Sequence, residues 1–201
     1  MSISCRLEKK FYRLGYKKIA GLDEVGRGAL AGPIMAAGVV FSQRQLTNRK
    51  ILKEVNDSKK LTAAKREKLF FLIKKNCQNW VVVGVNHKII DRVGIEKANH
   101  LVFEKVLRKI KPDLALIDGR IKIDQKKGKC QSIIKGDQKI FSIAAASILA
   151  KVTRDHLMIK LDKKYPGYNL GKHKGYGTEL HYSNLKKHGP CTCHRLSFRL
   201  K

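Results

Sequence analysis

Short apolar segments of strand length are the feature that most constrains how this chain can fold. Two of them follow one another early in the sequence, and the later ones alternate with longer segments whose apolar residues recur at helical spacing. Strands that alternate with helices pair in parallel, whereas strands joined by a short turn pair antiparallel. The pattern therefore predicts an α/β fold with a mixed sheet flanked by helices. The predicted strands cover residues 18–23, 34–41, 80–85, 114–117 and 131–134.

The chain of 201 residues contains no internal repeat, no linker and no clear domain boundary. We therefore expect one domain that spans residues 1–201. Its tail is rich in loops from about residue 165. The segment 42–60 is polar and shows no periodicity. Helices are expected from the N-terminus to about residue 15 and over residues 62–75, 95–111, 140–164 and about 178–187.

The charge balance points to a polyanionic partner. Lys and Arg number 44 and Asp and Glu only 16, which gives a net charge of +28 at pH 7. Such an excess favours binding to a nucleic-acid backbone, although a general bias toward lysine would produce the same surplus. No apolar run reaches the length of a membrane span, and the N-terminus lacks a secretory signal, so we expect a cytoplasmic protein without membrane contact. The five scattered cysteines do not resemble a disulfide framework.

Four carboxylates stand where an apolar segment gives way to glycine: Asp23, Glu24, Asp118 and Asp137. Each of them alone is readily explained as a turn former or a helix cap. Together, without His or Cys close by in sequence, they suit Mg²⁺ or Mn²⁺, and two such ions can promote the hydrolysis of a phosphodiester. Neighbouring residues of a strand point to opposite faces, so Asp23 and Glu24 can share a metal pair only if the strand ends or bends there. Gly26 permits such a bend.

Three loops carry residue types that suit a nucleic acid. Gly26, Arg27 and Gly28 offer backbone N–H groups and a guanidinium, although a turn is the simpler explanation of this spacing. Ser58 and Lys59 precede a predicted helix, where they fit a backbone contact or a helix cap. Tyr176 lies among basic residues, as a stacking platform would, and half-buried packing explains it equally well.

Two further kinds of site find little support. Cys191, Cys193 and His194 are close in sequence, with His181 and His188 upstream, but structural zinc sites normally use a wider cysteine spacing and a second ligand pair. The chain also lacks a nucleophile-elbow pattern, so a serine or cysteine nucleophile is not indicated.

Taken together, five motifs resemble ribonuclease HII, the type 2 ribonuclease H family. They are GLDEVGRGALAGP, NDSKKLTAAKRE, ALIDGR, KGDQKIFSIAAASILAKVTRD and KGYGTELH…HGPCTCHRLSF, and they occur in the family's order from about residue 18 onward. The resemblance implies a ribonuclease H-like fold, a mixed sheet flanked by helices, with a small C-terminal helical extension from about residue 165. It also implies an endonuclease that cuts RNA in RNA–DNA hybrids and cuts on the 5′ side of single ribonucleotides in duplex DNA, leaving 3′-hydroxyl and 5′-phosphate ends.

The resemblance also assigns roles to individual residues. The family's metal-binding carboxylates fall on the four acidic residues already identified, and its loop that reads the ribose 2′-hydroxyl falls on Gly26, Arg27 and Gly28. Its substrate-strand contacts include the region of Ser58 and Lys59, and its junction tyrosine falls on Tyr176. Small departures from the family pattern, Ala29 and the Cys191-Thr192-Cys193 stretch, leave the carboxylates untouched.

Three functional classes remain distinguishable. A type 2 ribonuclease H, which we expect to act as a monomer with two divalent ions, fits the whole motif set. A basic nucleic-acid-binding protein without catalysis would need no carboxylate cluster. A related metal-dependent nuclease that cuts DNA would need no loop for the 2′-hydroxyl, and the type 3 enzymes differ by a GKG-like loop and an extra N-terminal domain.

Overall fold

The computed structural model describes residues 3–48, 54–58, 61–121, 123–124 and 129–200. Its centre is a five-stranded sheet in the order β3-β2-β1-β4-β5. Strand β1 pairs antiparallel with β2 and parallel with β4, while β2–β3 is antiparallel and β4–β5 is parallel. The predicted mixed sheet is confirmed. The strands are β1 (Ile19–Val25), β2 (Ile34–Val40), β3 (Asn79–Val85), β4 (Leu114–Asp118) and β5 (Cys130–Ile133).

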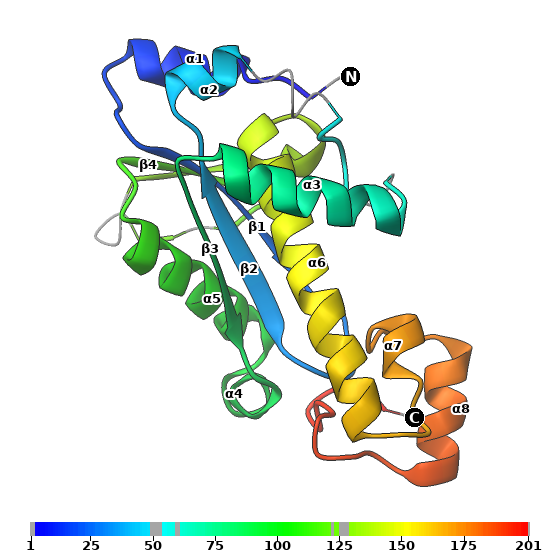
Figure 1. Ribbon diagram of the computed structural model, residues 1–201. Coiled ribbons are helices and arrows are strands. Elements are labelled where there is room, and N and C mark those ends of the chain that lie inside the picture. The colour runs from blue at the N-terminus through cyan, green and yellow to red at the C-terminus, as the bar shows by residue number, and fades with distance from the viewer. Residues whose placement is uncertain (1–2, 49–53, 59–60, 122, 125–128, 201) are drawn as a thin grey trace.

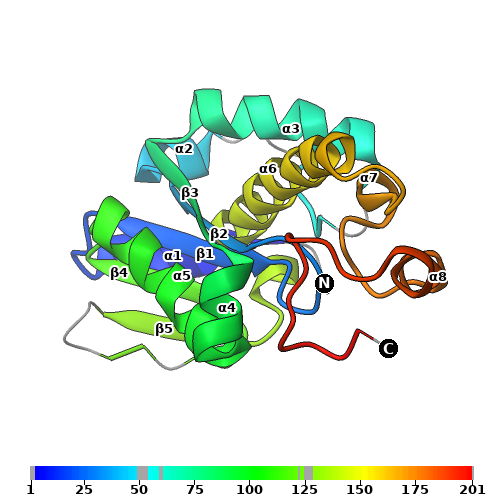
Figure 2. The same cartoon turned by 90° about the horizontal axis from the view of Figure 1, so that it is seen from below.

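Helices cover both faces of this sheet, which gives three layers (Figures 1 and 2). Helix α6 (Phe141–Lys164) lies along one face with α3 (Ala63–Asn76) outside it, and α5 (Ile95–Ile110) covers the other face. The alternation of side chains along β2 explains the two cores. Ala37 and Val39 pack with the α6 layer, whereas Ala36 and Val40 pack with α5.

Two short helices appear where periodicity predicts none. Helix α2 (Gln43–Thr47) lies in the polar segment 42–60, and α4 (His87–Val93) follows β3. Five to seven residues are too few to show a repeating apolar face, so their signal lies in the caps. Ser42 accepts the N–H of Gln45 in a capping box, and Asn86 accepts the N–H of Ile89. The remaining helix at the N-terminal end is α1 (Arg6–Arg13).

The C-terminal extension packs against the last turns of α6 and contains α7 (Leu170–His173) and α8 (Glu179–His188). Met158 of α6 contacts a small apolar cluster that includes Tyr168, Leu170 and Leu185. The extension, coloured orange to red, therefore lies at one end of the sheet layers (Figure 1).

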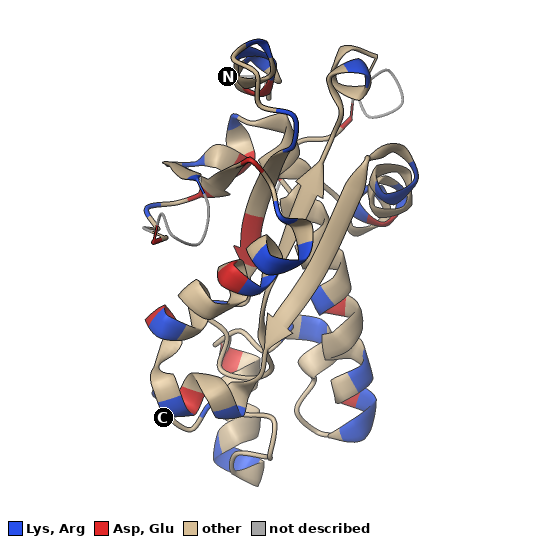
Figure 3. Cartoon of the chain, turned by 90° about the vertical axis from the view of Figure 1, so that its left-hand side faces the viewer, with Lys and Arg blue, Asp and Glu red and all other residues tan. Residues whose placement is uncertain are grey.

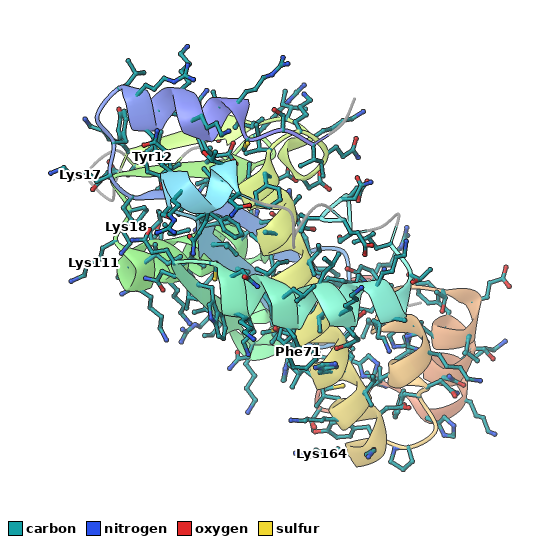
Figure 4. The ribbon with its side chains drawn as sticks, turned by 45° about the horizontal axis from the view of Figure 1, so that its top comes forward. Tyr12, Lys17, Lys18, Phe71, Lys111 and Lys164 are labelled. Atoms are coloured by element: carbon teal, nitrogen blue, oxygen red, sulfur yellow. The ribbon has the colours of Figure 1, made fainter. Side chains whose placement is uncertain are left out.

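Basic side chains occupy both ends of the molecule. Figure 3 shows Lys and Arg on helices and loops at both ends, while an acidic stretch interrupts the otherwise neutral sheet. Figure 4 shows Lys17, Lys18 and Lys111 near one end of the sheet and Lys164 at the other, where α6 ends. The positive charge is thus distributed over the fold. Among the described residues, no helix combines the length and the apolar character needed to cross a bilayer.

The position of α6 depends on a close approach to β1. A Cβ atom at Gly21 would lie 2.2 Å from the carbonyl carbon of Ser142 and 2.4 Å from the nitrogen of Ile143, at the start of α6. The same turn of α6 is held by Glu8, whose Oε1 accepts the N–H and the hydroxyl of Ser142, each at 3.0 Å. The N-terminal helix therefore caps the helix that covers the sheet.

Gly21→Ala is expected to destabilise the protein by about 2 kcal/mol or more, because the obstructing atoms belong to the backbone and cannot rotate away. Gly84→Ala in β3 is the matched control, since its nearest neighbours lie 3.5 Å from the added Cβ. Urea unfolding of both variants measures the difference. Equal stabilities would contradict the close packing of α6 on β1.

Candidate active site

Three aspartates meet at one edge of the sheet. Asp23 lies on β1, Asp118 ends β4, and Asp137 lies in the short 3₁₀ helix η3 (Gly136–Gln138). One carboxylate oxygen from each lies within 4.8 Å of the other two. Because β1 and β4 are adjacent and parallel, their carboxyl ends reach the same edge. The sheet topology therefore explains how residues 95 and 114 positions apart form one cluster.

The turn after β5 brings the third aspartate into place. The N–H of Gly136 donates to Oδ1 of Asp118 at 2.6 Å, which ties the start of η3 to the end of β4. The N–H of Ile140 donates to the Gly136 carbonyl at 2.8 Å and leads directly into α6. Asp137 is 4% exposed, so its carboxylate lies at the bottom of the site.

Glu24 stands beside this cluster and outside the group of three. Strand β1 continues to Val25, and Glu24 still pairs with Ala36, so its side chain points to the opposite face from Asp23. It lines two adjoining hollows, of which one holds the aspartates and the other reaches Glu96 and Asn99. Glu24 therefore reaches the site from the other side of β1.

A cleft of about 510 Å³ opens above the aspartates. It brings together most of the residues that the sequence singles out, including Ser58 and Tyr176; Lys59 lies outside the described residues. The sequence analysis missed Arg66, Ser147 and Lys151. The spacing of Ser147 and Lys151 could have indicated two of them, because residues four apart on a helix lie on the same face. The cleft is lined by Asp23, Glu24, Val25, Gly26, Arg27, Gly28, Ser58, Arg66, Asp118, Asp137, Ser147, Lys151 and Tyr176.

Ser58 anchors its loop to the wall of the cleft. Its hydroxyl lies 2.9 Å from the hydroxyl of Ser147, and only 5% of the residue is exposed. Arg66 donates to the carbonyls of Ser58 and Leu61 at 2.9 and 2.6 Å. Ser58 is therefore held by Ser147 of α6 on one side and by Arg66 of α3 on the other.

Two buried arginines shape the loop that contains Gly26, Arg27 and Gly28. Arg195 donates to the carbonyls of Gly26, Arg27 and Gly32 at 2.7 to 2.9 Å. Arg154 donates to those of Ala31 and Pro33, and to Lys174 in the C-terminal extension, at 2.9 to 3.1 Å. Burial, together with the neighbouring charge of Arg154, lowers the pKa of Arg195 to about 9, and burial also lowers the pKa of Arg154.

The two glycines of this loop have different roles. Gly26 has φ +86°, and a Cβ there would lie 2.2 Å from Nε of Arg154, so the position is reserved for packing against the arginine. A Cβ at Gly28 would meet nothing within 4 Å. Gly28 therefore leaves open backbone at the mouth of the cleft.

Tyr176 lies beside this loop although about 150 residues separate them in sequence. The backbone of Tyr176 forms an isolated antiparallel bridge with Ala29. Its ring lies over the charged groups of Arg154 and Lys151, at 5.3 and 5.9 Å from the ring centroid. The arrangement fixes an aromatic surface next to open backbone and above carboxylates.

The electrostatics of the cluster oppose its own ionisation. Burial raises the pKa of Asp23 well above its ordinary value, and the negative charges of Glu24, Asp118 and Asp137 raise it further. A hydrogen bond from Ser147 acts in the opposite direction. Crowded, buried carboxylate oxygens of this kind are the donor set that hard divalent cations require, and a cation would relieve the repulsion. The residues present therefore fit Mg²⁺ or Mn²⁺.

Asp23→Asn is expected to raise the free energy of unfolding measured in EDTA at neutral pH. The pKa of Asp23 is higher in the folded than in the unfolded state, so stability is greatest in acid and is lost as the pH rises through the folded pKa. Asn keeps the oxygen that accepts the N–H of Glu24 and removes the charge. Urea unfolding in EDTA and in excess Mg²⁺ tests this, because the cation should abolish the advantage. A less stable variant in EDTA would contradict the assigned cause.

Comparison with known proteins identifies the family. The family model for ribonuclease HII matches residues 20–201. The ribonuclease HII of Caldicellulosiruptor bescii is 47% identical over 194 residues, which cover 96% of this chain and 91% of the relative. The ribonuclease HII of Archaeoglobus fulgidus, solved in complex with PCNA, has a TM-score of 0.77 at 28% identity and covers 92% and 96% of the two chains. The ribonuclease H2 of Pyrococcus horikoshii has a TM-score of 0.75, also at 28% identity, with coverage of 91% and 94%. The matched sequence and the shared fold show that this chain belongs to the ribonuclease HII family of nucleases.

Proposed function

We propose that this chain hydrolyses RNA in RNA–DNA hybrids and cuts on the 5′ side of single ribonucleotides embedded in duplex DNA, leaving 3′-hydroxyl and 5′-phosphate ends. The observation that carries the proposal is the cleft itself. Three aspartates form its floor, while the open backbone of Gly28 and the ring of Tyr176 lie on its walls. The aspartates suit hydrolysis of a phosphodiester, and the backbone of Gly28 and the ring of Tyr176 suit contact with a sugar.

Asp23, Asp118 and Asp137 would hold the divalent cations, with Glu24 contributing from the other side of β1. When bound, two such ions supply the Lewis acidity that favours attack of water on a phosphodiester and departure of the leaving oxygen. The carboxylates would position the ions, and the ions would neutralise the negative charge of the carboxylates. Lys151 and Arg66, also on the cleft, add positive charge that attracts the phosphates of the substrate.

The hydrogen bonds that Arg195 donates to the loop carbonyls support recognition of the 2′-hydroxyl by backbone groups. In a trans peptide the C=O of one residue and the N–H of the next point in opposite directions. The carbonyls of Gly26 and Arg27 face Arg195, so the N–H groups of Arg27 and Gly28 point away from it. These two donors suit a ribose hydroxyl, because a hydroxyl both donates and accepts and its recognition leaves the base unread.

A non-catalytic nucleic-acid-binding protein remains the opposing hypothesis. It would explain the net charge of +28 but would have no use for three crowded carboxylates in the cleft. A nuclease of the same fold that needs no ribonucleotide would have no use for open backbone beside an aromatic ring. A DNA duplex with one ribonucleotide, and the same duplex with none, separate the three hypotheses when product ends are mapped with and without Mg²⁺.

Asp137→Asn is expected to reduce the cleavage rate about 100-fold or more while hybrid binding at low salt persists. The carboxylate acts on the chemistry, whereas the Lys and Arg side chains supply the affinity. Single-turnover cleavage and filter binding measure the two effects separately. Asp162→Asn near the far end of α6 is the matched control. Unchanged turnover in Asp137→Asn would remove this residue from the proposed site.

Tyr176→Ala is expected to impair cleavage at a lone ribonucleotide more than cleavage of an all-RNA strand paired with DNA. The ring would pack on the sugar of the deoxynucleotide that follows the ribonucleotide, and a continuous RNA strand lacks that junction at most positions. Tyr165→Ala, another half-buried tyrosine at the end of α6, is the control. Equal losses on the two substrates would mean that Tyr176 supports only the fold or general binding.

A further inference from the structure

A second group of metal-ligating side chains lies in the C-terminal extension, separate from the aspartates. Cys191, Cys193 and His194 each offer a ligand atom within 4.8 Å of the other two. The Sγ atoms of Cys191 and Cys193 are 3.3 Å apart, and Nδ1 of His194 is 3.2 Å from Sγ of Cys191. A tight turn causes this convergence, because the N–H of His194 donates to the carbonyl of Cys191 at 3.0 Å. The three ligand atoms therefore lie close together, although the cysteine spacing in the sequence is not typical of a zinc site.

The hydrogen bonds around His194 indicate which ring nitrogen carries the lone pair, and Nδ1 is the nitrogen that lies beside the sulfur of Cys191. Nδ1 of His181 lies 3.0 Å from the carbonyl oxygen of Tyr176, which only accepts, so this nitrogen carries a hydrogen. His181 is fully buried, where the uncharged ring is favoured, so its Nε2 accepts from Nε2 of His194 at 3.0 Å. His194 therefore keeps its lone pair on Nδ1. The N–H of Cys191 donates to that same atom at 3.0 Å, so a metal ion bound there would replace this hydrogen bond.

We propose that Cys191, Cys193 and His194 bind one Zn²⁺ ion. Two thiolates and an imidazole are the ligands that zinc prefers, whereas Mg²⁺ and Mn²⁺ prefer the oxygens of the aspartates. Tetrahedral zinc with ordinary bond lengths places two sulfurs about 3.8 Å apart and a sulfur and a nitrogen about 3.5 Å apart. The observed separations are a few tenths of an ångström shorter, so a slight widening of the turn admits the ion. His181 would act as the supporting partner that fixes the ring of His194.

The surroundings give this site a structural role. Cys193 and His194 are almost fully buried, while Cys191 is partly exposed. The ring of His194 packs 5.1 Å from that of Tyr168, in the cluster that joins the extension to α6. The ion would therefore stabilise the turn that precedes Arg195. Its neutralisation of two thiolates also suits a buried setting.

Cobalt substitution tests the proposal directly. Reduced, metal-free protein is titrated with Co²⁺ in excess Mg²⁺, which keeps the aspartates occupied by a hard ion. We expect one Co²⁺ per chain with a thiolate-to-cobalt charge-transfer band and the visible bands of tetrahedral cobalt, both displaced by Zn²⁺. Zn²⁺ at about 100 times its dissociation constant is expected to raise the melting temperature by about 5 °C or more.

Matched cysteine variants assign the signal. Cys191→Ser and Cys193→Ser are expected to raise the dissociation constant for Zn²⁺ about 100-fold or more, whereas Cys77→Ser and Cys130→Ser leave it unchanged. Asp137→Asn is expected to keep the cobalt bands, which distinguishes this site from the proposed catalytic one. If a variant fails to fold, alkylation of the wild-type protein replaces it, because Zn²⁺ should protect Cys191 and leave Cys77 reactive. Absence of the charge-transfer band, or its persistence in Cys191→Ser, overturns the proposal. A metal-free Cys191–Cys193 disulfide in freshly purified protein would also overturn it, in favour of a redox pair.

Discussion

The arrangement of the cleft depends on two buried guanidinium groups. Arg154 and Arg195 are fully buried, and together they donate six hydrogen bonds to backbone carbonyls. Burying a charge is costly unless strong partners replace its water, and carbonyl oxygens in a folded loop provide them. The hydrogen bonds stabilise both partners, because the arginines gain acceptors and the loop after β1 gains a fixed shape. Either arginine lost would leave several buried carbonyls without a donor.

These arginines also explain why parts distant in sequence form one site. Arg154 comes from α6, the same helix that presents Ser147 and Lys151 to the cleft, and Arg195 comes from the turn after α8. Both hold the loop after β1, which carries Asp23 at its base. The sheet edge supplies the acidic floor, and the arginines set the position of the wall above it. Distance between floor and wall is thereby fixed by the packing of α6 on β1, where Gly21 allows close contact.

Much of this could be predicted from the sequence, and the exceptions have physical causes. All five strands follow from short apolar segments, and the long helices follow from their periodicity. Helices α2 and α4 were not predicted, because they are too short to show periodicity. Their N-caps, Ser42 and Asn86, specify them instead. Asp23, Asp118 and Asp137 meet as strand ends predict, and Glu24 lines the same cleft beside them, outside the group of three. The cluster around Cys191 depends on a turn whose hydrogen bonds only the folded chain defines.

The loop after β1 is held by Arg195, a residue that is synthesised late. Every strand and all three aspartates precede α6 in the chain, and Arg195 lies 169 residues beyond Gly26, which it holds. As the chain leaves the ribosome from its N-terminus, the sheet and its acidic edge emerge before the arginine that fixes the adjacent loop. A nascent chain can therefore contain the carboxylates long before it contains a shaped cleft. An unfinished chain that ends before Arg195 therefore lacks the donor that holds the carbonyls of Gly26 and Arg27.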